Sequence, residues 1–179
     1  MRHGEANHNV TGTINAEPNS TSSITKAGLA QARKLADKLA NEPIEAIFVS
    51  AFDRTKQTAS ALQQRIDAPL IIDPDINELR IGFEGEPLTN WKQARRKSSN
   101  PWTYKKTGAE SLANGVERAE RFITKLRETT YGTVAIVTHG FMVVAIRSLI
   151  EGDSVKELYE AGDPGAEISH DEVIELTLN

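Results

Sequence analysis

The residues best suited to chemistry stand at the ends of apolar runs. The first five residues, MRHGE, place a permanent cation, Arg2, beside an imidazole, His3, that can act as a nucleophile. A second histidine, His139, closes an apolar run far along the chain and is followed by Gly140. Arg54 stands just past another apolar run, in the stretch SAFDRTKQTA. Two histidines and two arginines at such positions indicate a pocket for an oxyanion, because guanidinium groups match the geometry of phosphate.

Length and composition predict one ordinary globular domain over 1–179, since 39% of the residues are hydrophobic and 26% are charged. The chain has no cysteine, which excludes disulfides, zinc–thiolate sites and cysteine nucleophiles. Its four histidines lack HxH or HExxH spacing, so we expect no metal site. The net charge of −4 argues against a nucleic-acid partner. No long apolar stretch or secretory signal is present, so we predict a cytoplasmic protein with no membrane partner.

Apolar runs alternate with amphipathic stretches, which predicts strands and helices in turn. The strands are expected over 44–49, 70–72, 134–137 and 173–178, and the helices over 26–41 (capped by Thr25), 53–65, 112–129 and 141–150. This alternation predicts a three-layer α/β/α sandwich around a mainly parallel sheet. Ligands bind beyond the carboxyl ends of the strands in such sheets. Ser50, Arg54, Thr138 and His139 all fall there.

The position of His3 is unusual for this architecture. A site residue normally follows a buried strand, yet only Met1 and Arg2 precede His3. Either the chain lacks its first strand, which is how we interpret the fold, or the numbering begins inside a longer sequence. If Met1 is the true start, we expect the nucleophile to be poorly fixed and the activity low.

Six short segments follow one another over nearly the whole chain: RHGE at 2–5 with Asn9 downstream, ITKAGLAQA at 24–32, SAFDRTKQTA at 50–59, NEL at 77–79 followed by GFEG at 82–85, GAES at 108–111, and THG at 138–140. In this order they resemble the signature elements of the histidine phosphatase superfamily, the phosphoglycerate mutase-like group. The GAES segment departs from the family's GGES turn in its second residue. The resemblance implies the phosphoglycerate mutase-like fold.

The resemblance also implies roles for individual residues. His3 would be the nucleophile that forms a phosphohistidine, and Glu78 would be the acid that protonates the leaving oxygen. The group bound to His3 would be held by Arg2, Asn9, Arg54, His139 and Gly140. General chemistry agrees, because phosphoryl transfer needs cations and donors around the phosphate oxygens and a proton for the leaving group. Glu5, Glu84 and Glu86 are alternatives to Glu78.

Other polar residues are interpreted more simply. His8 and His170 are expected on the surface. Ser50 either caps the following helix or touches the site, and Glu110 and Ser111 either begin a helix or touch ligand. Residues 91–106 hold six basic residues and no acid. We therefore predict that 85–108 is a basic, lid-like insertion over an anionic substrate, with a solvated surface excursion as the alternative.

These observations favour a metal-independent phosphatase of the histidine acid type that needs no cofactor. It would hydrolyse a small anionic phosphate ester. The short interval from Pro87 to Gly108 favours a compact phosphatase, whereas mutases of the group carry a long insertion there. The alternatives are a cofactor-dependent phosphoglycerate mutase-type phosphotransferase and a non-catalytic phosphate-binding relative. An exposed edge strand near the C-terminus could pair two chains into a homodimer.

Overall fold

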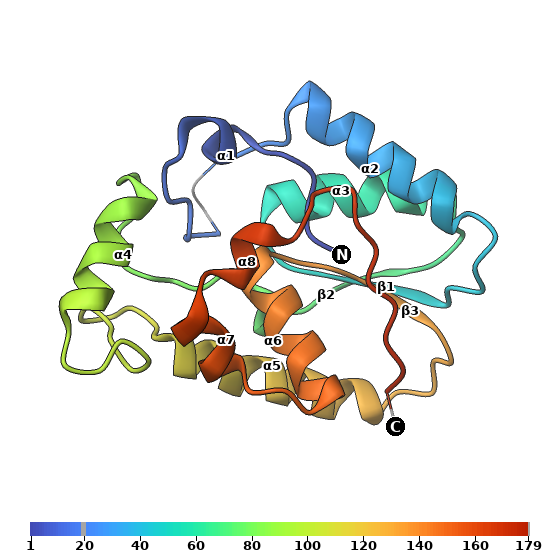
Figure 1. Ribbon diagram of the computed structural model, residues 1–179. Coiled ribbons are helices and arrows are strands. Elements are labelled where there is room, and N and C mark those ends of the chain that lie inside the picture. Colours follow the sequence, from blue (N-terminus) through green and yellow to red (C-terminus); the bar gives the residue numbers. More distant parts are fainter. Residues whose placement is uncertain (19–20, 179) are drawn as a thin grey trace.

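A small parallel sheet forms the centre of the molecule. The computed structural model describes residues 1–18 and 21–178, and within them the sheet has three strands in the order β2–β1–β3 (Figure 1). The strands are β1 (Ala46–Val49), β2 (Leu70–Ile72) and β3 (Val134–Val137). Val49 at the end of β1 lies opposite Ile72 of β2 and Val137 of β3. The carboxyl ends of all three strands therefore lie side by side at the same end of the sheet.

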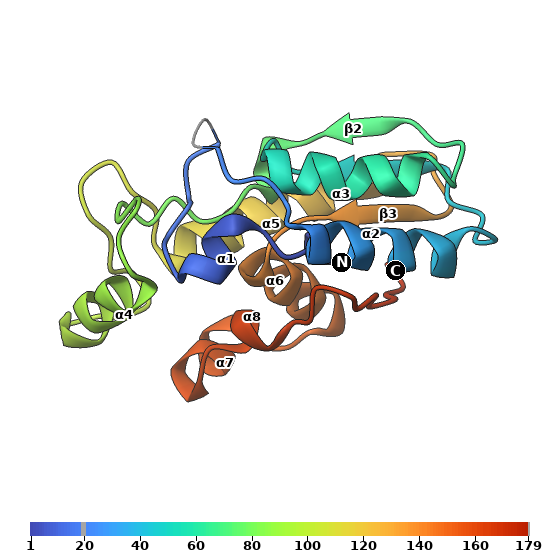
Figure 2. The same cartoon turned by 90° about the horizontal axis from the view of Figure 1, so that it is seen from above.

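Helices cover both faces of this sheet (Figures 1 and 2). Helices α2 (Lys26–Leu39) and α3 (Asp53–Gln63) pack on each other over one face. Helices α5 (Leu112–Arg127) and α6 (Gly140–Glu151) pack on each other over the opposite face. The remaining helices are α1 (Asn7–Thr11), the 3-10 turn η1 (Pro74–Ile76), α4 (Leu88–Lys97), α7 (Val155–Ala161) and α8 (Pro164–Glu167). The predicted three-layer α/β architecture is confirmed.

The central strand β1 is buried on both faces, as its continuous apolar run indicates. Ile47 and Val49 join one core cluster with residues of α2 and α3. Ala46 and Phe48 join the other cluster with residues of α5 and α6. Successive side chains of a strand point to opposite faces, so one short strand ties both helical layers together.

Two glycines let the N-terminal segment cross helix α2. A Cβ on Gly4 would collide with the backbone of Gly28, and a Cβ on Gly28 would collide with the backbone of Glu5. Thr25 caps the helix at this crossing by accepting a hydrogen bond from the Gly28 amide at 3.0 Å. The close approach brings the residues after His3 onto the first turn of α2.

One local prediction is wrong. Residues 173–178 do not pair into a strand in the described part of the chain, although Val173 and Leu176 pack against the two core clusters. Packing alone therefore explains their apolar alternation. The homodimer was suggested by an edge strand here, and this strand is not formed. Two short helices were not predicted: α4 lies within 85–108, and α1 lies in the polar segment before Thr25. No helix in the described residues is long and apolar enough to cross a membrane.

Candidate active site

The end of β3 pairs with the beginning of the chain. Arg2 forms a parallel bridge with Thr138; the His3 amide donates to the Thr138 carbonyl at 2.9 Å, and the Thr138 amide donates to the Met1 carbonyl at 3.1 Å. The short segment before His3 thus extends the sheet beyond β3. It places the His3 ring against the His139 ring, with 5.3 Å between the centroids. The chain start holds its histidine as a strand end would.

Hydrogen bonds to both ring nitrogens orient His3. Nδ1 lies 2.7 Å from the Gly4 carbonyl, which can only accept, so Nδ1 carries the proton and Nε2 carries the lone pair. Arg54 Nε donates to that lone pair at 3.2 Å. Burial, and next the positive charge of Arg54, keep the pKa of His3 well below its usual value. The ring is therefore neutral and has the tautomer that a nucleophilic Nε2 requires.

His139 sits at the start of α6 and is fully buried. Its Nε2 lies 2.7 Å from Ser50 Oγ, and its Nδ1 lies 3.1 Å from Arg54 Nη2. Burial, followed by the charge of Arg54, lowers the pKa of His139 well below its usual value. Ser50 also accepts from the Phe52 amide at 3.3 Å, so it serves both the turn and the site. Ser50 therefore touches the site and does not cap α3, whose N-cap is Phe52.

Arg54 is the cation between the two histidines. It is buried, its guanidinium carbon lies 4.3 Å from the centroid of the Phe52 ring, and burial lowers its pKa to about 10. Asn15 receives it through both the side-chain oxygen and the backbone carbonyl, the latter at 3.1 Å. The sequence analysis did not identify Asn15. It lies in a polar segment without a motif, and only the folded chain brings it to Arg54.

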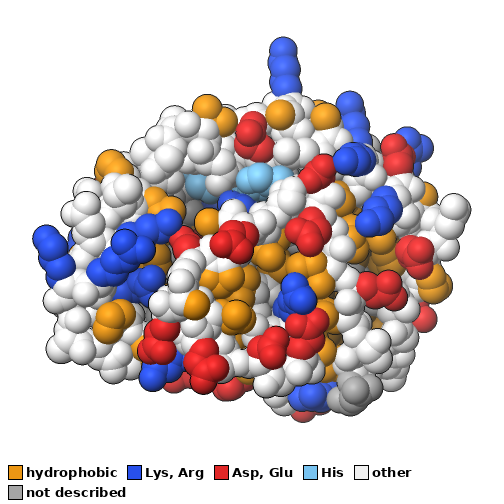
Figure 3. Space-filling view, viewed as in Figure 1, with side chains coloured by type: hydrophobic (Ala, Val, Ile, Leu, Met, Phe, Trp, Pro, Cys, Tyr) orange, Lys and Arg blue, Asp and Glu red, His pale blue; other side chains and the backbone are white. Residues whose placement is uncertain are grey.

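Arg2, Asn9 and Gly140 line a cavity of about 260 Å³ together with Glu78. Arg2 Nη1 donates to the Ile168 carbonyl at 2.8 Å. The Asn9 side-chain oxygen accepts from the Ala6 amide at 2.9 Å, and its amide nitrogen lies 3.1 Å from His8 Nε2. Histidine side chains reach the surface on the same face as acidic and hydrophobic atoms (Figure 3). Arg2, Asn9 and Gly140 thus share one cavity with Glu78, whereas Arg54 and His139 lie buried beside His3.

Glu78 is the predicted acid nearest to the histidines. Its Oε2 lies 3.8 Å from His139 Nδ1, and its Oε1 accepts from the Leu79 amide at 3.0 Å. The three alternative glutamates have other partners. Glu5 accepts from Thr25, Glu84 accepts from the Ala16 amide, and Glu86 accepts from Asn90. The geometry favours Glu78 over them.

A buried arginine on α5 holds the loop that carries Glu78. Arg118 donates to the carbonyls of Asp75 and Asn77, each at 2.9 Å, and to the Glu78 carbonyl at 3.3 Å. Its other contacts are two hydrogen bonds to Glu110, at 2.8 and 3.2 Å. The glutamate of the GAES segment therefore anchors Arg118, and Ser111 caps α5 by accepting from the Asn114 amide at 3.2 Å. Both residues act in structure here.

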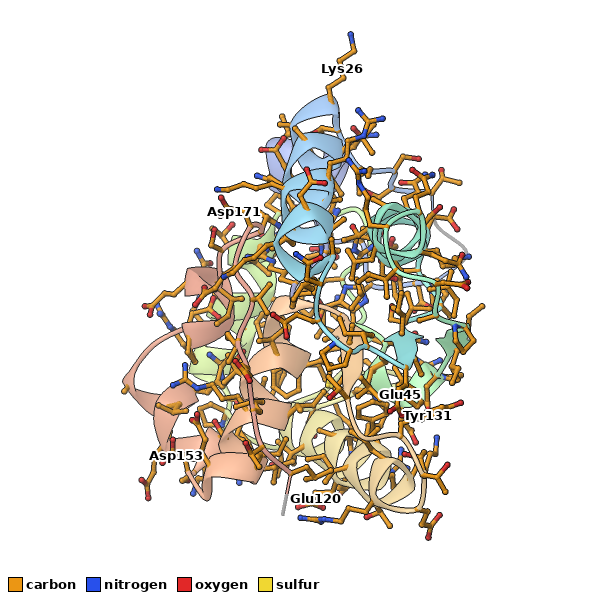
Figure 4. All side chains as sticks on the ribbon, turned by 90° about the vertical axis from the view of Figure 1, so that its right-hand side faces the viewer. Lys26, Glu45, Glu120, Tyr131, Asp153 and Asp171 are labelled. Carbon is orange, nitrogen blue, oxygen red and sulfur yellow. The ribbon has the colours of Figure 1, made fainter. Side chains whose placement is uncertain are left out.

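His8 and His170, which we expected on the surface, are half-buried and lie beside His3. Their ring centroids lie 5.6 and 5.4 Å from that of His3. His170 Nδ1 donates to the His3 carbonyl at 2.6 Å. The next residue, Asp171, lies beside α2 and binds Lys34 at 2.8 Å (Figure 4). Neither histidine follows an apolar run, so the sequence held no signal for their burial.

Part of the basic segment, residues 91–106, packs against the rest of the molecule. Trp91 and Arg95 of α4 are buried, and Lys92 binds Asp163 at 2.6 Å. Lys106 lies over the Phe83 ring, 3.3 Å from its centroid. These contacts attach the segment to the body of the molecule. Whether it acts as a lid stays a prediction.

The chain is similar to known proteins in both sequence and structure. Residues 1–173 match the model of the histidine phosphatase superfamily, branch 1. The chain is 29% identical over 161 residues to "Probable phosphoglycerate mutase GpmB" of Proteus mirabilis, covering 85% of this chain and 73% of that protein. The alpha-ribazole phosphatase from Shigella flexneri is similar in structure, with a TM-score of 0.74, 26% identity, and coverage of 89% of this chain and 82% of that one. A mycobacterial glucosyl-3-phosphoglycerate phosphatase has a TM-score of 0.76 at 21% identity, covering 90% and 83%.

Proposed function

The chain belongs to the histidine phosphatase superfamily, and we propose that it hydrolyses small phosphate monoesters through a phosphohistidine on His3. The observation that carries the proposal is the state of the His3 ring. It is buried and neutral, with Nδ1 donating to the Gly4 carbonyl and Nε2 carrying the lone pair that a nucleophile needs. The similar protein from Shigella flexneri is also named a phosphatase.

In the first half-reaction, the Nε2 lone pair of His3 attacks phosphorus and the bond to the ester oxygen breaks. The electron pair leaves with that oxygen, which takes a proton from the Glu78 carboxyl group and departs as the alcohol. Arg54 donates to Nε2 in this structure at 3.2 Å. The entering phosphate must therefore become the new partner of Arg54 before the attack.

In the second half-reaction, water attacks the phosphorus of the phosphohistidine. The Glu78 carboxylate accepts a proton from this water, the N–P bond breaks, and its electron pair returns to Nε2. Inorganic phosphate is released and His3 is restored. The same carboxyl group thus serves as acid and then as base.

We assign the phosphate oxygens to Arg2, Asn9, Arg54, His139 and the amide of Gly140. Fixed donors aimed at the transferring group stabilise its developing charge. A helix N-terminus adds partial positive charge, and Gly140 begins the 12-residue helix α6. Loss of a single such donor commonly costs about 100-fold or more in rate.

We further propose that the reaction needs no metal ion. Cationic side chains already surround the place of the phosphate, and each of the four histidines has a ring nitrogen within hydrogen-bond distance of a protein group. A cytoplasmic location stays a prediction.

Hydrolysis of p-nitrophenyl phosphate tests the proposal. We expect turnover without added metal, unchanged by chelator, and lost when His3 is replaced in His3→Ala. A phosphate adduct on His3, trapped by rapid acid-free quenching and located by mass spectrometry, should be present in the parent protein. Activity that survives His3→Ala, or that chelator abolishes, would overturn the mechanism.

The mutase alternative has one observation in its favour, the name of the Proteus mirabilis relative. It differs from hydrolysis in what accepts the phosphoryl group. With a phosphoglycerate as substrate, we expect release of inorganic phosphate to exceed formation of the isomer. The opposite ratio would establish a phosphotransferase, whereas absence of both products with every ester would establish the non-catalytic relative.

A further inference from the structure

One wall of the cavity beside Glu78 is apolar. It is formed by segments that meet only in the folded chain, namely the loop after η1, helix α4 and the starts of α5 and α6. Its members are Leu79, Ile81, Leu88, Trp91, Leu112 and Phe141. All except Leu88 are buried, and Leu88 is 38% exposed. Hydrophobic atoms and some histidine atoms are visible on the same face of the molecule (Figure 3).

The wall lies where the alcohol half of an ester must go. Glu78, as the proposed acid, contacts the leaving oxygen, so the carbon bonded to that oxygen lies beside Glu78 and points away from His3. The next residues along the chain, Leu79 and Ile81, belong to the apolar wall. Gly115 of α5 brings the wall together, since a Cβ there would collide with the side chains of both Phe141 and Leu79.

Polar side chains of segment 13–15, which pairs with 85–88 along the same cavity, are already engaged. The side-chain oxygen of Asn15 accepts from Arg54, and its amide donates to Glu84 at 3.3 Å. The hydroxyl of Thr13 lies 2.7 Å from that of Thr11. A polyhydroxylated alcohol in this cavity would lose hydrogen bonds to water and find few to replace them, which costs binding free energy.

We propose that this wall is a subsite for an apolar alcohol group, so that the substrates are alkyl or aryl phosphate monoesters rather than sugar or glycerol phosphates. The inference rests on the proposed function, because it uses the place assigned to the leaving oxygen. The driving force is removal of the alkyl or aryl surface from water against buried side chains.

Matched esters test the subsite. We expect kcat/KM to rise about threefold for each methylene from ethyl to butyl to hexyl phosphate. Propyl phosphate should exceed glycerol 1-phosphate, and hexyl phosphate should exceed a hexose 6-phosphate, by about tenfold or more. Equal or higher values for the polyol esters would refute the subsite while the hydrolase survives. Failure to hydrolyse any ester would instead refute the proposed function.

Two leucines of equal exposure provide a matched pair of variants. Leu88 on the wall and Leu158 on α7 are each 38% exposed. Leu88→Asn should flatten the dependence on chain length, whereas Leu158→Asn should leave it unchanged. Binding of hexylphosphonate, measured by calorimetry, needs no turnover and should exceed that of methylphosphonate by about 100-fold or more. Equal binding of the two phosphonates, or equal effects of the two substitutions, would refute the proposal.

Discussion

His3 and Glu78, the two residues proposed to exchange bonds with substrate, are held in place by different means. The backbone of His3 is paired with Thr138 at the edge of the sheet, and its ring is held by its own neighbour, Gly4. Glu78 lies in a loop whose carbonyls are gathered by Arg118, a side chain from a later helix. The nucleophile depends on main-chain pairing, and the loop of the acid depends mainly on the side chain of Arg118, which pairs with Glu110.

This difference indicates how the two parts of the site respond to change. A sheet edge tolerates side-chain substitutions nearby, because backbone hydrogen bonds do not depend on the residue type. The loop that carries Glu78 relies mainly on the guanidinium of Arg118, so it should shift when that group changes shape. We therefore expect proton transfer to be more sensitive than nucleophilic attack to substitutions outside the site. Four experiments test this comparison.

The largest effect should separate acid from nucleophile. Glu78→Gln keeps the shape of the side chain and removes its proton, so kcat for alkyl phosphates should fall about 1000-fold. The fall should be much smaller for dinitrophenyl phosphate, whose leaving group needs no proton. His3→Ala should abolish both reactions. Rates are measured over a series of leaving groups, and equal losses with all esters in Glu78→Gln would point to a different acid.

A smaller loss should follow substitution of the cation that both histidines share. Arg54→Lys keeps the charge and removes the forked donors that reach His3, His139 and Asn15. We expect kcat/KM to fall about 100-fold, equally for good and poor leaving groups, because the donors act on the phosphate. A loss confined to poor leaving groups would contradict this assignment.

The contrast in positioning is tested on helix α5. Arg118→Lys cannot hold the carbonyls of the loop and Glu110 at once, so esters with poor leaving groups should lose about tenfold in kcat. Good leaving groups should be nearly unaffected. Arg121→Lys is the control, because this exposed side chain binds the same loop through the Asp75 carboxylate at 3.0 Å. Proportional losses for all esters would mean that Arg118 supports only the general fold.

The smallest effect concerns stability. Burial, followed by Arg54 and Arg2, lowers the pKa of His8 to about 3. Between pH 6.5 and 3 the unfolded chain therefore binds a proton at His8 that the folded chain does not, so stability is full above pH 6.5 and falls as the pH drops. Between pH 7.5 and pH 5, the unfolding free energy of His8→Asn should therefore fall by about 1 kcal/mol less than that of the parent protein, with allowance for the partial exposure of His8. Urea denaturation at both pH values measures this, and parallel losses in the two proteins would contradict it.

Elements whose residues are neighbours in the sequence were predictable. Strand β1 and helix α2 carry the period of their own secondary structure, and Thr25 marks the helix start. Helix α4 was missed because its many charged residues hide the apolar side of Trp91. Residues 173–178 were mistaken for a strand because alternation reports burial on one side. It does not report whether a neighbouring strand is available.

The sequence by itself determined the residue types of the site, because a nucleophile, cations and an acid for phosphate must be of a few kinds and stand at strand ends. The tertiary structure alone decided how these residues are held. Asn15 beneath Arg54, His170 against His3, Arg118 beneath Glu78 and the apolar wall of the cavity all join segments far apart in the chain. The physical reason is that hydrogen bonds and burial across such distances exist only after the helices have packed on the sheet.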